Sequence, residues 1–180
     1  DDDVAGFTIA ETEGSTGVDE SGSTDLFTVV LTGRPITDVA FSISSSDSTE
    51  TSVTSSLTFT SENWNTPQNV TVTGLDDDII DGTQTSTITV SIDDTNSDNS
   101  FDPINDQTVS ATNADDDVAG FTVSEPDGST TVTEAGGTDT FNVVLNAQPN
   151  TDVILSITSS DTGEATVTTS LTFTLSLIHI

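Results

Sequence analysis

Apolar and polar residues alternate along several short segments of this chain. In residues 39–43, 70–72 and 88–92, every second residue is apolar and most of these are β-branched. Side chains two positions apart point to the same face of a strand, so each segment can bury one face of a sheet. The chain lacks the spacing of three to four residues that marks an amphipathic helix. The pattern therefore predicts an all-β protein.

Seven strands are expected within the first 114 residues. Clusters of Gly, Pro, Ser, Asn and Asp, such as residues 14–22 and 93–106, separate them and favour turns. Seven short strands joined by turns are typical of an antiparallel, immunoglobulin-like β-sandwich. The expected strands are residues 6–10, 25–32, 38–44, 52–60, 68–74, 85–92 and 107–113. The large core residues are expected to be Phe7, Phe27, Phe41, Leu57, Phe59 and Trp64.

The chain contains an internal repeat. Residues 1–60 align with residues 115–174 without a gap, and about two thirds of the aligned positions are identical. The offset of 114 residues is a usual length for one domain, so tandem sandwich repeats are expected. The first repeat is predicted to span residues 1–114 and to close with the acidic junction 115–117. Residues 115–174 correspond to the N-terminal half of a second, truncated repeat.

Residues 175–180 do not continue the repeat. Counterparts of residues 61–68 are due after Thr174, but the sequence LSLIHI stands there instead. This sequence resembles a translated transposon-end adapter from DNA library preparation, and it is interpreted as a non-native tail. A natural apolar strand is the alternative. Because the only histidine, His179, lies in this tail, no site is built on it.

Charge narrows the classes of function. The chain has 31 acidic residues and one basic residue, which gives a net charge of −30. Such a chain repels nucleic-acid phosphates and anionic lipid heads, so nucleic-acid binding is not expected. Apolar runs are too short for a membrane helix, so membrane insertion is not expected either. Acidic chains with few aromatic residues are often disordered, but the alternating apolar segments favour a folded sheet protein.

The residue types present do not predict an enzyme. The chain has no cysteine and no tyrosine, its one basic residue is Arg34, and its histidine lies in the tail. An acid–base pair would need two carboxylates with separated pKa values in a cleft, whereas the acidic clusters here follow strands or lie in loops. Without cysteine, the redox compartment cannot be inferred from disulfides.

Two acidic runs suggest a metal site. Asp76, Asp77 and Asp78 follow the expected strand 68–74, and residues 115–117 form the second run. Adjacent carboxylates repel by about 1 kcal/mol per pair at ~4 Å in water, and a divalent cation removes that repulsion. Calcium takes six to eight oxygen ligands in flexible geometry, so it suits carboxylates from several loops better than magnesium does. Solvated turns, or the surface charge of a halophilic protein, are the alternatives.

Several short motifs occur in the order of a known family. They are V-x-E-x-G at residues 18–22 and 132–136, L-T-F at 57–59, V-T-V at 70–72 and D-D-D-I at 76–79. Together with the closing acidic run, they resemble the Calx-beta domain of sodium–calcium exchangers, integrin β4 and many bacterial surface proteins. The resemblance covers one full repeat and the first half of another.

The resemblance implies a calcium site at one end of the sandwich. The family's Asp-Tyr before L-T-F is absent here, where Ser52 and Val53 are nearest, so fewer or weaker sites are expected. The Ile79 carbonyl is a further ligand candidate. The carboxylate ligands implied for Ca²⁺ are Glu20, Asp76, Asp77, Asp78, Asp81, Asp115, Asp116 and Asp117.

A second acidic segment partly mimics the spacing of an EF-hand loop. Asn99 replaces the glycine of that loop, and the flanking helices are not expected here, so it is interpreted as an Asx-rich loop rather than a metal site. Its oxygen-bearing residues are Asp94, Asn96, Asp98 and Asp102.

These observations predict a calcium-binding structural or adhesive spacer of a large extracellular protein, secreted or on a bacterial cell surface. Expected partners are calcium, neighbouring repeats of the same chain, and a surface protein or glycan. Close repetition favours mechanical extension over the alternative of a calcium-sensing regulatory domain. A carbohydrate- or protein-binding module is the other alternative. It would need an exposed aromatic platform, whereas Trp64 is expected to cap the core.

Overall fold

The structure is a computed structural model that describes residues 4–174. The predicted tail and its histidine lie outside the described residues. Contacts divide the described chain into two compact units. The first holds residues 4–77 and 81–116, and the second holds residues 78–80 and 117–174.

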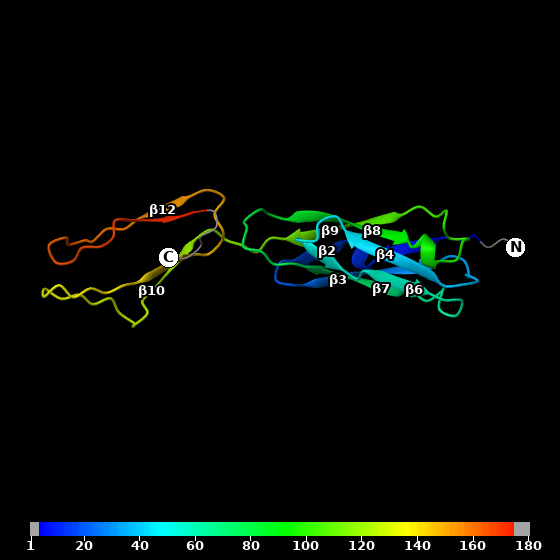
Figure 1. The fold of residues 1–180 in the computed structure, drawn as a ribbon, viewed down its shortest axis with the longest axis horizontal. Coiled ribbons are helices and arrows are strands. Elements are labelled where there is room, and N and C mark those ends of the chain that lie inside the picture. The colour runs from blue at the N-terminus through cyan, green and yellow to red at the C-terminus, as the bar shows by residue number, and fades with distance from the viewer. Residues whose placement is uncertain (1–3, 175–180) are drawn as a thin grey trace. The chain divides into compact units, whose positions relative to one another are not determined.

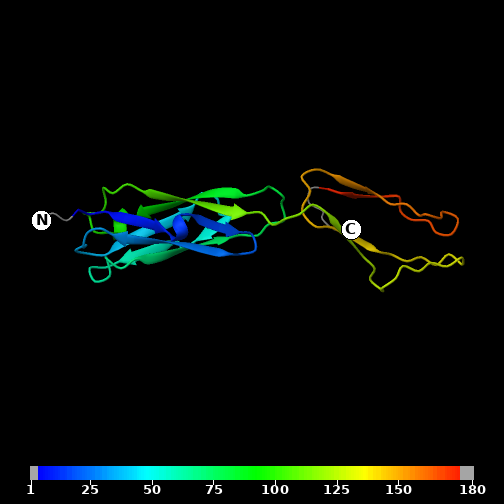
Figure 2. The same cartoon turned by 180° about the vertical axis from the view of Figure 1, so that it is seen from behind.

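Two sheets form the first unit, and their arrangement can be followed in Figures 1 and 2. One has the strand order β1-β3-β7-β5 and the other the order β2-β9-β8-β4-β6. All pairs are antiparallel except β2 with β9, which run parallel. The strands are β1 (Phe7–Glu11), β2 (Thr16–Asp19), β3 (Thr24–Leu31), β4 (Val39–Ser45), β5 (Thr51–Val53), β6 (Ser56–Phe59), β7 (Gln68–Gly74), β8 (Gln84–Ile92) and β9 (Gln107–Ala114).

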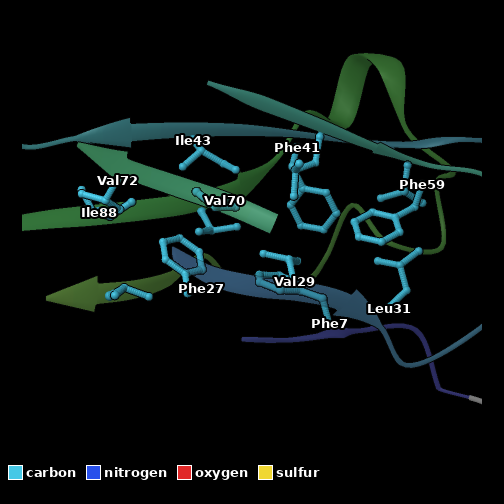
Figure 3. Packing of buried hydrophobic residues seen from close by; sticks show 14 of the residues in the cluster. Phe7, Phe27, Val29, Leu31, Phe41, Ile43, Phe59, Val70, Val72 and Ile88 are labelled. Atoms are coloured by element: carbon cyan, nitrogen blue, oxygen red, sulfur yellow. The ribbon is translucent and has the colours of Figure 1, made fainter. Parts of the chain in front are cut away.

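The core lies between these sheets, as the alternation predicted (Figure 3). Phe41 packs edge-on against Phe7, with ring centroids 5.0 Å apart, and against Phe59, at 5.7 Å. Trp64 is half-buried and packs against this cluster. The predicted all-β, antiparallel sandwich and its aromatic core are confirmed. Phe101 is also buried, although it lies in a segment that was expected to be only a turn-rich loop.

Two strand predictions were wrong. Residues 52–60 are two strands, because the chain changes sheets at Thr54 and Ser55: β5 pairs with β7, and β6 pairs with β4. β2 lies in a segment that was expected to be a turn cluster. It has one buried apolar residue, Val18, and it forms because β9 offers its edge as a partner. Regular pairing with a neighbouring strand thus outweighs a weak local pattern.

The second unit contains two small sheets, each of two antiparallel strands. Val143, Leu145 and Phe173 form its buried cluster. Its strands are β10 (Phe121–Ser124), β11 (Asn142–Leu145), β12 (Val153–Ser156) and β13 (Ser170–Phe173).

Helical structure in the described chain is limited to two single 3₁₀ turns, η1 (Thr12–Gly14) and η2 (Asp94–Asn96). Within residues 4–174, no helix has the length and apolar character needed to cross a membrane.

Candidate metal centre

Glu20 is placed at one end of the first unit by the pairing of β2 with β9. Asp19 lies opposite Ala114 in the parallel register, and the Glu20 N–H donates to the Ala114 carbonyl at 3.1 Å. Alternation along β2 turns the side chains of Val18 and Glu20 to the same inner face, where both are buried. The pairing therefore brings Glu20 beside the acidic run that follows β9.

The Glu20 carboxylate is 1% exposed and incompletely hydrogen-bonded. The backbone N–H of Asp116 donates to it, while the Oε2 atom has no hydrogen-bond partner. Loss of hydration on burial, together with the smaller effect of the nearby carboxylates of Asp115, Asp77 and Glu50, raises the pKa of Glu20 to about 7. The Asp116 N–H opposes this increase in pKa. A carboxyl group in such a place is either protonated or, when ionised, compensated by a cation.

Asp77 and Asp115 supply half-buried carboxylates from the two chain segments that follow β7 and β9. A carboxylate oxygen of Asp77 lies within 4.8 Å of one of Glu20. Asp115 Oδ2 accepts a hydrogen bond of 2.7 Å from the Gly82 N–H, which ties the β7–β8 loop to the end of β9. Gly82 has a φ of +73°, a conformation that favours glycine.

Sequence reasoning missed two further buried groups, Glu50 and Asn113. Asn113 Nδ2 donates to the Glu50 carboxylate at 3.2 Å and to the Glu50 and Leu75 carbonyls at 3.1 Å each. The recurrence of Glu50 as Glu164 in the second repeat could have revealed it. Glu50 lies two residues before Ser52, where the resemblance had suggested a missing acidic ligand.

The other predicted ligands are placed differently. Asp76, Asp81 and Asp116 are exposed, and Asp116 contributes its backbone N–H rather than a buried carboxylate. Asp78 and Asp117 belong to the second unit, in which the Asp78 carbonyl accepts from the Gln148 N–H at 2.6 Å. The first unit therefore gathers Glu20, Asp77 and Asp115 from the predicted set, together with Glu50.

The donor chemistry of this group fits a hard divalent cation. Its side-chain donors are carboxylate oxygens, and Asn113 adds a buried amide oxygen that also lacks a hydrogen-bond partner. Oxygen ligands from separate segments suit calcium, whose coordination is flexible. Without a cation, the buried Glu20 carboxylate and its acidic neighbours destabilise one another.

The EF-hand-like segment uses its carboxylates for backbone contacts instead. Asp98 is buried and accepts from the N–H groups of Ser100 at 2.9 Å, Thr37 at 3.1 Å and Ile36 at 2.7 Å. The bonds from Ser100 and Thr37 are the main causes that lower the pKa of Asp98, to about 2. Asp93 caps η2 by accepting from the Thr95 N–H. These contacts make the segment an ordered Asx-rich loop.

No known family model and no curated protein matches the sequence. Solved structures resemble it at a low level. The apo-form Calx CBD1 domain is 16% identical, with a TM-score of 0.42, and the match covers 62% of this chain and 98% of that chain. The calcium binding domain CBD12 of CALX1.1 is 16% identical, with a TM-score of 0.44, over 96% of this chain and 73% of that chain. The E. coli chaperone DraB is 10% identical, with a TM-score of 0.44, over 96% and 87% of the two chains. The chain is an antiparallel β-sandwich protein on the evidence of its own sheets.

Proposed function

We propose that the first unit is a calcium-binding β-sandwich repeat, with the ion held by Glu20, Glu50, Asp77 and Asp115. The observation that carries this proposal is the buried Glu20 carboxylate, which has an oxygen without a hydrogen-bond partner and lies among other carboxylates. Such an arrangement is costly in a protein without a bound cation, because burial and like charge both oppose ionisation. A divalent cation removes both costs at once.

The position of the site supports a role in stability. Its residues come from segments after β2, β7 and β9, and from the loop before β5, so a bound ion links both sheets of the sandwich. An ion that binds only the folded state stabilises it by RT ln(1 + [L]/Kd), about 2.7 kcal/mol at 100 times Kd. For a unit of this size, that corresponds to an increase in Tm of about 10 °C or more.

The test is thermal unfolding of the full chain at high ionic strength, with calcium, magnesium or a chelator. Trp64 is the only tryptophan and packs against the first unit's core, so its fluorescence follows the unfolding of that unit. High salt screens the net charge of −30 in every sample, which separates ion binding from screening. The expected result is a calcium-dependent increase in Tm. An equal shift with magnesium would contradict the choice of calcium.

A matched pair of variants locates the site. Glu20→Gln should abolish the calcium shift, because it removes the buried charge. Glu134 is the counterpart of Glu20 in the second repeat and is exposed, so Glu134→Gln should keep the shift. Equal Tm values with calcium and with chelator in the unsubstituted chain would reject the metal site.

For the parent protein, the role we propose is an extracellular structural or adhesive spacer, secreted or on a bacterial surface. The repeat at an offset of 114 residues and the acidic composition support it. The full-length reading frame tests this role. Further repeats with a secretion or anchoring signal are the expected result, whereas a flanking transmembrane transporter would favour a calcium sensor instead.

A further inference from the structure

Asn113 is a buried amide beside the carboxylate group of the first unit. It lies in β9 opposite Val18 of β2, and its side chain is 1% exposed. Glu20, two residues after Val18, turns to the same inner face. Buried polar groups are normally satisfied by hydrogen bonds, so an amide in this place needs partners for both its nitrogen and its oxygen.

The nitrogen of this amide has three acceptors. Asn113 Nδ2 donates to a carboxylate oxygen of Glu50 at 3.2 Å, and to the carbonyl oxygens of Glu50 and Leu75 at 3.1 Å each. Because all three partners are carboxylate or carbonyl oxygens, exchanging the nitrogen and the oxygen of the amide would set four oxygens against one another. The orientation of the amide is therefore fixed, and its oxygen lies on the side away from these acceptors.

The oxygen of the amide is buried without a donor. Asn113 Oδ1 accepts no hydrogen bond from the residues that the structure describes. A Cβ atom at Gly74 would lie 2.7 Å from Oδ1 and 2.1 Å from the Asp19 carbonyl oxygen, so Oδ1 faces the end of β2 that leads into Glu20. Glu20 Oε2, also buried, likewise finds no partner among residues 4–174. Both oxygens carry the cost of an unsatisfied buried acceptor.

The same amide holds Glu50 near Glu20. The Glu50 carboxylate that Nδ2 binds is close enough to Glu20 to contribute to its raised pKa. A carboxylate at position 113 would add a further negative charge to this group, and it could not donate to Glu50 when ionised. Asparagine supplies an oxygen at this position without adding charge.

We propose that Asn113 binds the cation through Oδ1, positions Glu50 through Nδ2, and in this way selects calcium over magnesium. This inference rests on the calcium site proposed above and adds a neutral ligand to its four carboxylates. Calcium accepts six to eight oxygens, amide carbonyls among them, in flexible geometry. Magnesium requires a near-ideal octahedron and keeps several waters, so it gains less from an oxygen that the protein holds in a fixed place.

The experiment titrates the full chain with calcium chloride by calorimetry at high ionic strength, and measures magnesium by its competition with calcium. Asn113→Ala removes the oxygen ligand and the donor to Glu50 together. Calcium affinity should fall by about 10- to 100-fold, the usual effect of losing a group that orients metal ligands, and magnesium affinity by less than about threefold. Thr112→Val is the matched control and should leave both affinities unchanged, because Thr112 precedes Asn113 in β9, is exposed and faces the opposite way.

A spectroscopic measurement needs no variant. The side-chain carbonyl resonance of Asn113, observed by NMR in the isotope-labelled full chain, should move when calcium is added and move less with magnesium. The side-chain N–H groups should remain protected from exchange with either ion, because Nδ2 stays bonded to Glu50 and Leu75. This measurement decides the question if Asn113→Ala does not fold, which Trp64 fluorescence shows.

Each contrary result has a different meaning. Equal losses of calcium and magnesium affinity in Asn113→Ala would leave Asn113 a structural role only and overturn the proposal. An unchanged calcium affinity, or a carbonyl resonance that calcium does not move, would overturn it as well, and both results leave the calcium site in place. The absence of calcium binding to the unsubstituted chain would instead reject the calcium site itself.

Discussion

Glu20 is unusual among the carboxylates of this chain because it is buried and its pKa is raised. A carboxylate that is 1% exposed loses almost all its hydration, and a single N–H from Asp116 replaces only part of it. Asp98 shows the opposite case in the same unit, because its three backbone donors lower its pKa despite burial. Burial alone therefore does not mark a metal ligand. Glu20 differs from Asp98 because it combines burial with a carboxylate oxygen that has no hydrogen-bond partner.

The raised pKa of Glu20 predicts how stability depends on pH without calcium. The pKa is about 7 in the folded chain against an ordinary value of 4.5. Between these values the folded protein holds a proton that the unfolded protein has released. Its stability therefore falls as pH rises from 4.5 to about 7, by about 3 kcal/mol in total, and is level above that range. Denaturant unfolding between pH 5 and 8 in chelator, followed by Trp64 fluorescence, measures this slope.

Substitution isolates the group responsible. Glu20→Gln should remove the slope, whereas Glu134→Gln should retain it, because Glu134 is exposed. A slope that persists in Glu20→Gln would show that another group titrates in this range. A stability that rises with pH would contradict the raised pKa itself.

Sequence reasoning at this scale found acidic residues but not their burial. Asp76 and Asp77 are adjacent and chemically identical, yet Asp77 is half-buried and Asp76 is exposed. Glu50 was missed because no acidic run surrounds it. Its burial depends on Asn113, which is 63 residues away and bonds to its carboxylate. A contact between residues so far apart in the sequence leaves no pattern in the residues around either of them.

At the scale of elements, β2, β7 and β9 meet where Glu20 is placed. Gly74, the last residue of β7, marks how closely they approach. A Cβ atom there would lie 2.1 Å from the Asp19 carbonyl oxygen and 2.7 Å from Asn113 Oδ1. Only glycine allows β7 to pass the end of β2 at this distance.

Gly74→Ala should therefore destabilise the first unit by about 1–3 kcal/mol, since the backbone of β2 or β7 must shift. Because β2 carries Glu20, the calcium shift in Tm should also decrease. Gly17→Ala is the matched control, with its nearest contact at 3.4 Å to Thr112 Oγ1, and should cost less than about 1 kcal/mol. Denaturant midpoints from Trp64 fluorescence compare the two. Equal stability of both variants would show that β2 and β7 are not closely packed.

The elements predicted from sequence were those with their own alternating pattern. β3, β4, β7 and β8 follow from apolar residues at every second position, whereas β2 has only Val18. The second repeat supports this explanation. Its counterpart of β2 is residues 130–133, which form no strand and make a single bridge from Thr133 to Gly137. The structure of this segment thus depends on a partner such as β9.

At the scale of the whole molecule, the two copies of the repeat differ in how many strands pair in their sheets. β3 and β11 are counterparts, but β3 is paired on both edges, by β1 and β7, and β11 is paired by β10. The first unit buries a continuous core, while the buried cluster of the second has three residues with partly exposed neighbours. The two repeats are identical at about two thirds of their aligned positions, so their local sequences predict similar stability. We expect instead that the second unit opens more easily than the first, because its core is less complete.

Hydrogen exchange of the full chain tests that expectation. Amides of β3 should exchange only when the first unit unfolds, because strands on both sides and a closed core protect them. Amides of β11 should exchange by local opening, at least about 100-fold faster at the same pH. Calcium should slow exchange in β3 further and leave β11 unchanged, since the proposed ligands all belong to the first unit. Equal protection of residues 25–31 and 139–145 would show that the second unit has a closed core of its own.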